Sequence, residues 1–249
     1  MAGARQTARR SLGRLGIGIG LGEKGRHELA YWRSRLEAQG DLEDGSPHYA
    51  WLFTDYFGLP STFYDGRRVL DIGCGPRGSL EWAAGADERV GLDPLADEYR
   101  RLHSREHAMR YVKGGAERIP FPDCHFDVVS SINSLDHVDD LGRALAEIAR
   151  VARPGGLWLL LTDVNHEPTP TEPQAYSWDL LELLAPEWEL VERRDWERPS
   201  DNMFDNLRFG SPYDHSREGR PGILSARLRR SATRGAPRAL RTSHLSRAS

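Results

Sequence analysis

Three closely spaced glycines between an apolar run and a helix-like pattern constrain this chain more than any other feature. The apolar run is Val69, Leu70 and Ile72, the glycines are Gly73, Gly75 and Gly78, and the spaced apolar residues that follow are Leu80, Trp82 and Ala83. This order predicts a strand, a tight turn and a helix. Because glycine has no Cβ, backbone amides at the turn can approach a ligand closely. The segment therefore predicts a ligand-binding α/β unit.

Two acids flank this unit. A second apolar run, residues 90–92, ends in Asp93, 18 residues after Gly75, where a carboxylate can accept both hydroxyls of a ribose. The glycine spacing alone also satisfies the dinucleotide fingerprint, in which a pyrophosphate lies on a helix N-terminus. Asp71 argues against that ligand, because an anion just before the first glycine repels a pyrophosphate and attracts a cationic amine and a sulfonium.

Residues 69–75 (VLDIGCG), followed by residues 91–93 (GLD), resemble motif I and the second-strand acid of class I S-adenosylmethionine-dependent methyltransferases of the small-molecule, type 11-like kind. The resemblance runs from about residue 67 to residue 164. It implies a doubly wound, mostly parallel, seven-stranded α/β sheet of the Rossmann-like methyltransferase fold, with the last strand inserted antiparallel between its neighbours. It also implies S-adenosyl-L-methionine as the cofactor.

The resemblance places this cofactor along the glycine turn and the neighbouring strand ends. The implied cofactor-binding residues are Asp71, Gly73, Cys74, Gly75, Asp93, Pro94, Leu95, Ala116, Glu117 and Asn133. Pro94 and Leu95 would flank the ribose and the adenine, and Glu117 would lie beside the adenine ring. The competing interpretation of Glu117 is a solvated loop acid. Arg77 departs from the small residue usual in such a glycine loop, unless its side chain points to solvent.

The catalytic residues are expected after the fourth strand of the sheet. A sulfonium supplies the driving force for methyl transfer, so the protein mainly has to hold a nucleophile in line with the methyl carbon. A hydroxyl acceptor also needs a base, for which histidine is suited near neutral pH. We expect His137 to be that base, with Asp136 or Asp139 as its orienting partner. The alternative is that His137 only caps or packs the next helix.

A metal site at the same edge is a further alternative. His166, Asp163 and Glu167 follow the expected fifth strand, and together with Asp136 they could offer oxygen and nitrogen ligands to an ion that acidifies a hydroxyl. Their spacing is not diagnostic of a metal site. We therefore expect no metal here and interpret residues 163–167 as a loop that binds the acceptor.

The sequence divides into a basic tail at 1–22, a helical cap at 23–60, the methyltransferase domain at 61–229 and a second basic tail at 230–249. Seven cap residues are aromatic: Tyr31, Trp32, Tyr49, Trp51, Phe53, Tyr56 and Phe57. They either pack the cap onto the sheet or form a lid that excludes water from the ligand. Both roles are compatible.

Charge and composition exclude several classes. The net charge of −3 includes eleven arginines in residues 1–22 and 223–249, so the remainder carries about −14 and is a poor surface for nucleic acid. We expect the tails to be disordered, with binding to phosphates or anionic lipid as the alternative. The mean hydropathy of −0.60 and the absence of a long apolar run exclude a membrane span. Cys74 and Cys124 are expected to be reduced thiols of a cytoplasmic protein.

Periodicity predicts the remaining elements. The expected strands are 109–112, 126–131, 157–164, 188–196 and 222–228, the expected helices are two or three in 24–59 followed by 95–106, 141–151 and 178–184, and residues 197–221 are expected to be irregular.

We therefore expect an S-adenosylmethionine-dependent methyltransferase that transfers a methyl group to a small-molecule acceptor, at oxygen, by in-line displacement. The alternatives are an NAD-dependent oxidoreductase and a non-catalytic scaffold that keeps the cofactor pocket. Neither the acceptor's identity nor the oligomeric state follows from the sequence.

Overall fold

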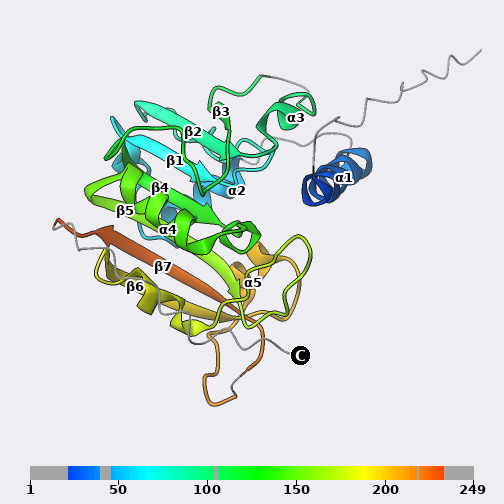
Figure 1. Ribbon diagram of the computed structural model, residues 1–249, viewed down its shortest axis with the longest axis vertical. Helices are drawn as coiled ribbons and strands as arrows, with labels where there is room; N and C mark the ends of the chain where they lie inside the picture. The colour runs from blue at the N-terminus through cyan, green and yellow to red at the C-terminus, as the bar shows by residue number, and fades with distance from the viewer. Residues whose placement is uncertain (1–21, 40–45, 104–105, 218, 233–249) are drawn as a thin grey trace, which may run out of the picture.

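A computed structural model describes residues 22–39, 46–103, 106–217 and 219–232. The two predicted basic tails lie outside these residues except at their inner ends. The described residues contain one sheet of seven strands in the order β3-β2-β1-β4-β5-β7-β6 (Figure 1). The strands are β1 (Arg68–Ile72), β2 (Glu88–Asp93), β3 (Arg110–Lys113), β4 (Phe126–Ile132), β5 (Ala152–Val164), β6 (Trp188–Glu197) and β7 (Gly222–Arg230).

The direction of β7 settles the topology. Strands β1 to β5 are parallel, whereas β7 runs antiparallel to both β5 and β6 and lies between them. This is the inserted strand that the resemblance implied and that a dinucleotide-binding fold lacks. The first switch of strand order lies between β1 and β4, so ligands are expected outside the carboxyl ends of these two strands.

Helices cover both faces of the sheet. They are α1 (Glu23–Gln39), α2 (Ser46–Trp51), the π-helix η1 (Leu52–Tyr56), η2 (Ser61–Tyr64), α3 (Ala96–Arg100), η3 (Leu135–His137), α4 (Leu141–Val151), η4 (Trp178–Leu184) and α5 (Met203–Phe209). Helix α4 begins where Asp140 accepts a hydrogen bond from the Arg143 amide at 3.0 Å, and it buries Ile148 against the sheet. The fully buried Trp158 lies in the same core layer.

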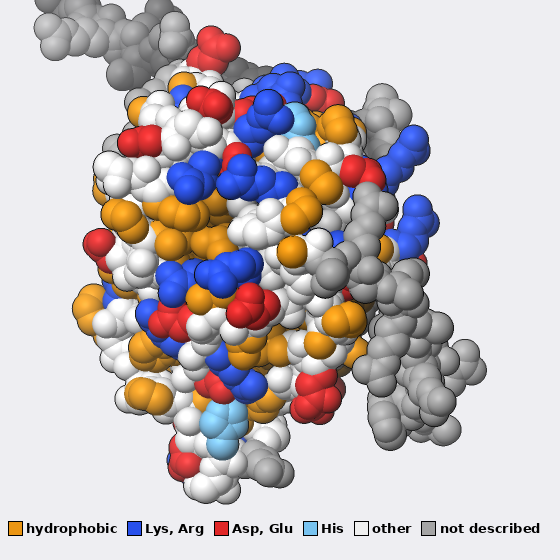
Figure 2. All heavy atoms as spheres, turned by 90° about the vertical axis from the view of Figure 1, so that its left-hand side faces the viewer, with side chains coloured by type: hydrophobic (Ala, Val, Ile, Leu, Met, Phe, Trp, Pro, Cys, Tyr) orange, Lys and Arg blue, Asp and Glu red, His pale blue; other side chains and the backbone are white. Residues whose placement is uncertain are grey.

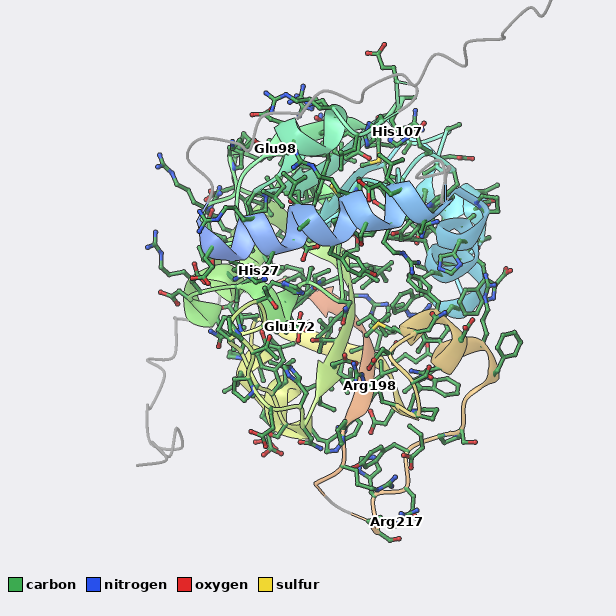
Figure 3. The ribbon with its side chains drawn as sticks, turned by 90° about the vertical axis from the view of Figure 1, so that its right-hand side faces the viewer. His27, Glu98, His107, Glu172, Arg198 and Arg217 are labelled. Atoms are coloured by element: carbon green, nitrogen blue, oxygen red, sulfur yellow. The ribbon has the colours of Figure 1, made fainter. Side chains whose placement is uncertain are left out.

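The predicted helical cap separates into two parts. Helices α2 and η1 pack on the opposite face of the sheet from α4, where Phe53, Tyr56 and Phe57 are buried. Helix α1 instead lies across the carboxyl edge of the strands, as Figure 3 shows. The aromatic residues of η1 therefore pack onto the sheet, which is one of the two expected roles, whereas α1 lies at the edge where the ligand is expected.

The prediction of a helix after the glycine turn is wrong, because the described residues between β1 and β2 contain no helix. Only 15 residues, 73–87, connect β1 to β2. Residues 78–86 instead form consecutive tight turns, in which the amides of Glu81, Ala83 and Ala86 each donate to the carbonyl three residues earlier. Glycine or proline stands at 73, 75, 76, 78 and 85, which leaves six residues between breakers, too few for a stable helix without strong packing.

A second correction concerns residues 197–221, which contain helix α5. Asn202 caps it by accepting from the Asp205 amide at 3.3 Å, and Met203 and Leu207 are buried against the α2 side of the sheet. The helix has only seven residues and lies in a polar segment, so its apolar periodicity is too short to recognise in the sequence. The predicted helix at 178–184 is present in the tighter 3₁₀ form.

The amino-terminal edge of the sheet carries mixed charge. Figure 2 shows arginine and lysine side chains interleaved with aspartate and glutamate on this side. Arg110 pairs with Glu88 at 2.7 Å, and Arg150 pairs with Asp123 at 3.0 Å. Among the helices that the structure describes, none has the length and apolar character needed to cross a membrane.

Glu81 fastens the 78–86 turns to the sheet, in the segment where a helix was predicted. Its two carboxylate oxygens accept from the amides of Ala108 and Met109 at 3.0 and 2.7 Å, fastening the 78–86 turns to the start of β3. We expect Glu81→Ala to lower the free energy of unfolding by about 1–3 kcal/mol, measured by urea denaturation, because two amides lose a charged acceptor. Asp87→Ala, an exposed acid of the same segment, is the control. Equal effects of the two substitutions would contradict this role.

Candidate functional site

The glycine turn begins directly after β1. Gly73 and Gly75 have φ values of +69° and +58°, a backbone conformation that glycine adopts without strain. The Gly73 amide donates to the Leu92 carbonyl at 2.8 Å, and a Cβ on Gly73 would collide with the side chain of Ser134. The turn is therefore packed tightly between the ends of β2 and β4, and only glycine fits its first position.

Asp71 lies at the end of β1 with its carboxylate buried. One oxygen accepts from the Ser79 hydroxyl at 2.5 Å and the other from the Ser130 hydroxyl at 2.6 Å. Ser130 is the cross-strand neighbour of Asp71 in the parallel pair of β1 and β4, so the register itself brings the two together. Burial raises the pKa of Asp71 to about 6, although both hydroxyls oppose the rise. Asp71 thus ties the turn segment to the sheet.

Asp93, at the end of β2, holds the other side of the turn. Its carboxylate accepts from the Leu95 amide at 2.8 Å and from the Gly75 amide at 3.2 Å. Burial raises the pKa of Asp93 to about 6, and the nearby charge of Glu28 in α1 also favours the protonated form. Asp71 and Asp93 are therefore brought to the same glycine turn, as the sequence predicted.

The remaining predicted cofactor residues occupy different environments. Pro94 is exposed, whereas Leu95 is buried in a small cluster with Leu29 of α1. Ala116 is buried in the core on the α4 side of the sheet. Asn133 has a φ of +50° directly after β4, and its side chain is exposed.

Two predicted residues have clear structural contacts. Glu117 accepts from the amides of Asp139 and Asp140, at 2.7 and 3.4 Å, so its carboxylate holds the turn before α4. The Cys74 side chain points into the core, where a Cβ on Gly91 would lie 2.6 Å from its sulfur. Burial raises the pKa of the Cys74 thiol well above its usual value. Only the backbone of Cys74 is therefore available to a ligand.

Helix α1 closes the turn from outside. Trp32 contacts Gly75, since a Cβ on that glycine would lie 3.4 Å from the indole, and its ring packs edge-on against Tyr99. Glu28 accepts from the Trp32 indole nitrogen at 2.8 Å. Lys24 donates to the His137 carbonyl and forms an ion pair with Asp139 at 3.3 Å. The helix thereby links the glycine turn to the segment after β4.

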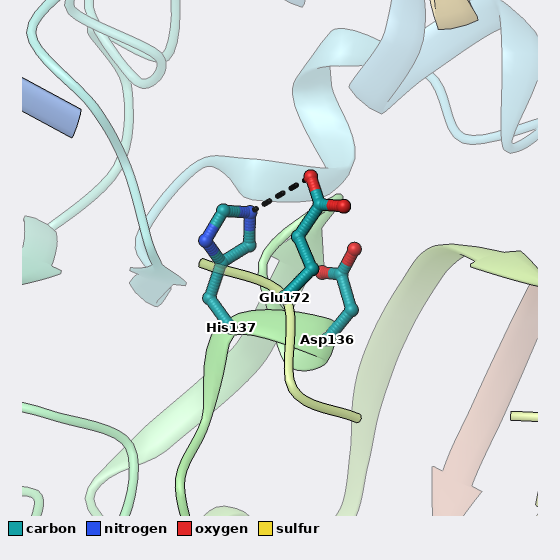
Figure 4. Close-up of side chains that lie close together, drawn as sticks. All are labelled: Asp136, His137 and Glu172. Carbon is teal, nitrogen blue, oxygen red and sulfur yellow. Dashed lines mark ion pairs between the residues drawn. The ribbon is translucent and has the colours of Figure 1, made fainter. Parts of the chain in front are cut away.

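The predicted catalytic pair lies in η3, at the carboxyl end of β4. Asp136 is only 1% exposed, and His137 is half-buried. Glu172, from the loop after β5, approaches His137 with 3.9 Å between Nε2 and Oε1 (Figure 4). Burial raises the pKa of the Asp136 carboxyl; His137 opposes the rise and Glu172 adds to it. The charge of His137 also opposes the rise in the pKa of Asp93, although burial dominates there, so the two groups are within electrostatic reach of each other.

Asp163 and His166 line the same edge. Arg198 pairs with one oxygen of Asp163 at 3.0 Å. Burial raises the pKa of Asp163 to about 6, with Arg198 opposing and Asp136 adding to the rise. His166 contacts the Glu167 carbonyl through Nδ1 at 3.0 Å, and the Glu167 side chain is exposed. Asp163 and His166 therefore lie within electrostatic reach of Asp136, whereas the Glu167 side chain is exposed.

Arg77 does not simply point to solvent. Burial lowers the pKa of His48 in α2, and the positive charges of Arg208 and Arg77 add to that effect. Burial raises the pKa of Tyr49 and the charge of Arg77 opposes the rise, so the guanidinium lies within electrostatic reach of α2. Within the described residues, its Nε is buried without a hydrogen-bond partner.

Sequence reasoning missed four contributors to the site. Ser79 and Ser130 anchor Asp71, Glu28 brings a charge beside Asp93, and Glu172 faces His137. A polar residue in the middle of an apolar strand was the available signal for Ser130. No local pattern indicates Glu28 or Glu172, because both reach the site through tertiary packing.

Comparison with known proteins agrees with this geometry. Residues 70–160 match the methyltransferase domain family known as Methyltransf_11. Malonyl-[acyl-carrier protein] O-methyltransferase of Erwinia billingiae is 35% identical over 130 residues, covering 51% of this chain and 49% of that protein. The chain spans about half or less of the length of the first curated relatives it matches.

Solved structures share the fold. An S-adenosylmethionine-dependent methyltransferase from Mesorhizobium loti superposes with a TM-score of 0.51 at 18% identity, covering 75% of this chain and 98% of that one. Geranyl diphosphate methyltransferase, solved with GPP and sinefungin, gives a TM-score of 0.53 at 20% identity and covers 74% and 77%. Residues 70–160 are therefore similar to methyltransferase domains, and the described residues share the Rossmann-like fold of solved S-adenosylmethionine-dependent methyltransferases, as the glycine turn and its acids indicated.

Proposed function

We propose that this protein transfers a methyl group from S-adenosyl-L-methionine to a small-molecule acceptor, at oxygen. The observation that carries the proposal is the buried Asp93 carboxylate at the tip of β2, which lies beside the glycine turn within the matched methyltransferase domain. A carboxylate at that strand end is suited to accept the two hydroxyls of a ribose. The O-methyltransferase named among the relatives favours oxygen as the acceptor atom.

The proposed cofactor site follows the turn and the strand ends. The residues are Asp71, Gly73, Cys74, Gly75, Asp93, Pro94, Leu95, Ala116, Glu117 and Asn133. Asp71 and Cys74 would act indirectly: Asp71 through its negative charge and the turn that it fastens, and Cys74 through its backbone. The negative charge of the two buried aspartates complements a cationic amine and a sulfonium.

On the acceptor side we propose His137 and Asp136 as the catalytic residues. The cofactor, when bound, supplies the electrophilic methyl carbon. His137 would hold or remove the acceptor's proton, Asp136 and Glu172 would orient the imidazole, and α1 would exclude water from above. Both cysteines are free thiols, as expected for the cytoplasmic location that we also propose.

Asp93→Ala tests the cofactor site. We expect this substitution to weaken S-adenosylmethionine binding by about 2 kcal/mol, roughly 30-fold in Kd, because the ribose loses a charged hydrogen-bond acceptor. Isothermal titration calorimetry measures the change. Asp97→Ala is the matched control, since Asp97 lies four residues on, in α3, and pairs at the surface with Arg100. Unchanged affinity in Asp93→Ala would remove Asp93 from the site.

The raised pKa of Asp93 predicts a pH dependence of cofactor affinity. Above pH 6 the carboxylate is ionised and accepts from the ribose; as the pH falls through about 6 it takes up a proton, so Kd should rise. Asp71 titrates in the same range and contributes its own part. We expect the Kd of Asp93→Ala to change less between pH 5 and 7 than that of the wild type, because of the two aspartates at the glycine turn only Asp71 then titrates in this range. An identical profile in wild type and variant would contradict the assignment.

His137→Ala should separate catalysis from cofactor binding. We expect unchanged S-adenosylmethionine affinity and turnover slower by about 100-fold, the usual contribution of a general base. Release of S-adenosylhomocysteine, first screened against fractions of cell extract to find an acceptor, measures turnover. Wild-type turnover in the variant would make His137 a structural residue of η3.

A further inference from the structure

Three metal-ligating side chains converge at the acceptor edge. One ligating atom from each of Asp136, His137 and Glu172 lies within 4.8 Å of the others. Figure 4 shows the two carboxylates and the imidazole turned toward one another, with Asp136 and His137 on η3 and Glu172 on the loop that follows β5. This set differs from the one that the sequence suggested, because it keeps Asp136 but contains His137 and Glu172 in place of Asp163, His166 and Glu167.

The buried carboxylate of Asp136 supplies an independent reason to expect a ligand. Asp136 is 99% buried, and its Oδ1 has no hydrogen-bond partner within the described part of the chain. An unpaired carboxylate oxygen is costly to bury unless a proton, a hydrogen-bond donor or a cation compensates it. Oδ1 of Asp163 and Nε2 of His166 are likewise buried and unpartnered among those residues. Several lone pairs at this edge are thus available to a cation.

The loop that carries Glu172 is fixed against η3. The Gln174 amide donates to the Asp136 carbonyl at 3.2 Å, and the Tyr176 hydroxyl donates to the Leu135 carbonyl. A turn closed by the Glu172 amide and the Thr169 hydroxyl at 3.0 Å sets the direction of the Glu172 side chain. The three groups are therefore held together by the backbone before any ion binds, which reduces the ordering cost of binding.

We propose that Asp136, His137 and Glu172 bind a divalent metal ion. One imidazole and two carboxylates form a mixed nitrogen and oxygen donor set, which suits Mn²⁺, Fe²⁺ or Zn²⁺ better than the all-oxygen sites of Ca²⁺. Two carboxylates and a neutral imidazole also balance the charge of a divalent ion.

The role of the ion rests on the proposed methyl transfer. A divalent ion beside the acceptor lowers the pKa of a coordinated hydroxyl, whose proton then leaves to water. The resulting oxygen forms a bond to the methyl carbon while the carbon–sulfur bond breaks, and sulfur keeps the electron pair. In this arrangement His137 acts by holding the ion rather than by taking the proton itself, so loss of turnover in His137→Ala cannot by itself distinguish the two roles.

Direct titration of the full chain with Mn²⁺ makes that distinction. After treatment with EDTA and its removal, we expect saturable binding of one Mn²⁺ per chain by calorimetry, accompanied by a broadened electron paramagnetic resonance signal. Glu172→Gln keeps the size of the side chain and removes a ligand, so Mn²⁺ affinity should fall at least tenfold. Glu167→Gln, an exposed acid of the same loop, should bind as the wild type does.

Two results would overturn the proposal: no saturable Mn²⁺ binding by the wild type, or equal affinity in Glu172→Gln and Glu167→Gln. Glu172 lies in a partly exposed loop position, so its substitution should leave the fold intact, which circular dichroism verifies. S-adenosylmethionine binding is measured on the same samples. Cofactor binding without metal binding would reject only the proposed metal site. Metal binding without cofactor binding would reject only the proposed methyl transfer.

Discussion

The carboxylate of Asp93 is the interaction on which the carboxyl edge of this sheet depends. It accepts from the Gly75 amide on one side and the Leu95 amide on the other, so a single side chain joins the turn after β1 to the chain that follows β2. The connection between β1 and β2 contains no helix that could position the turn. Side-chain carboxylates therefore carry the positioning: Asp93 and Asp71 at the turn itself, and Glu81 where the segment meets β3.

Buried acids make the carboxyl edge of the sheet negatively charged. Asp71, Asp93, Asp136 and Asp163 all lie at or just beyond the carboxyl ends of β1, β2, β4 and β5, and burial raises the pKa of each. Such a group of acids disfavours anionic ligands and favours cations. A sulfonium with a free amine on one side of the edge, and a divalent ion on the other, would both offset the cost of burying these carboxylates.

Local patterns in the sequence predicted the strands well, because each apolar run is short and bounded by glycine, proline or charge. The position of β7 came from the family resemblance, since strand direction depends on contacts remote in sequence. The prediction of a helix after the glycine turn was wrong, because apolar residues spaced as at 80–83 are also found in turns that pack against a core. The places of Asp93 and Asp136 at strand ends were predicted, because both follow apolar runs in the sequence. Glu28 and Glu172 were missed, since their loops and helices reach the edge only after folding.

Helix α1 is held over the glycine turn by few buried side chains. Among its described side chains, Leu29 alone is fully buried; Trp32 and Leu36 pack in the same cluster, and Lys24 contacts η3. Burying a leucine contributes only about 2 kcal/mol, so few contacts hold α1 compared with the layers of the sheet. We therefore expect α1 to move away from the glycine turn more readily than the sheet deforms, which would let a bound nucleoside exchange while the strand ends keep their positions.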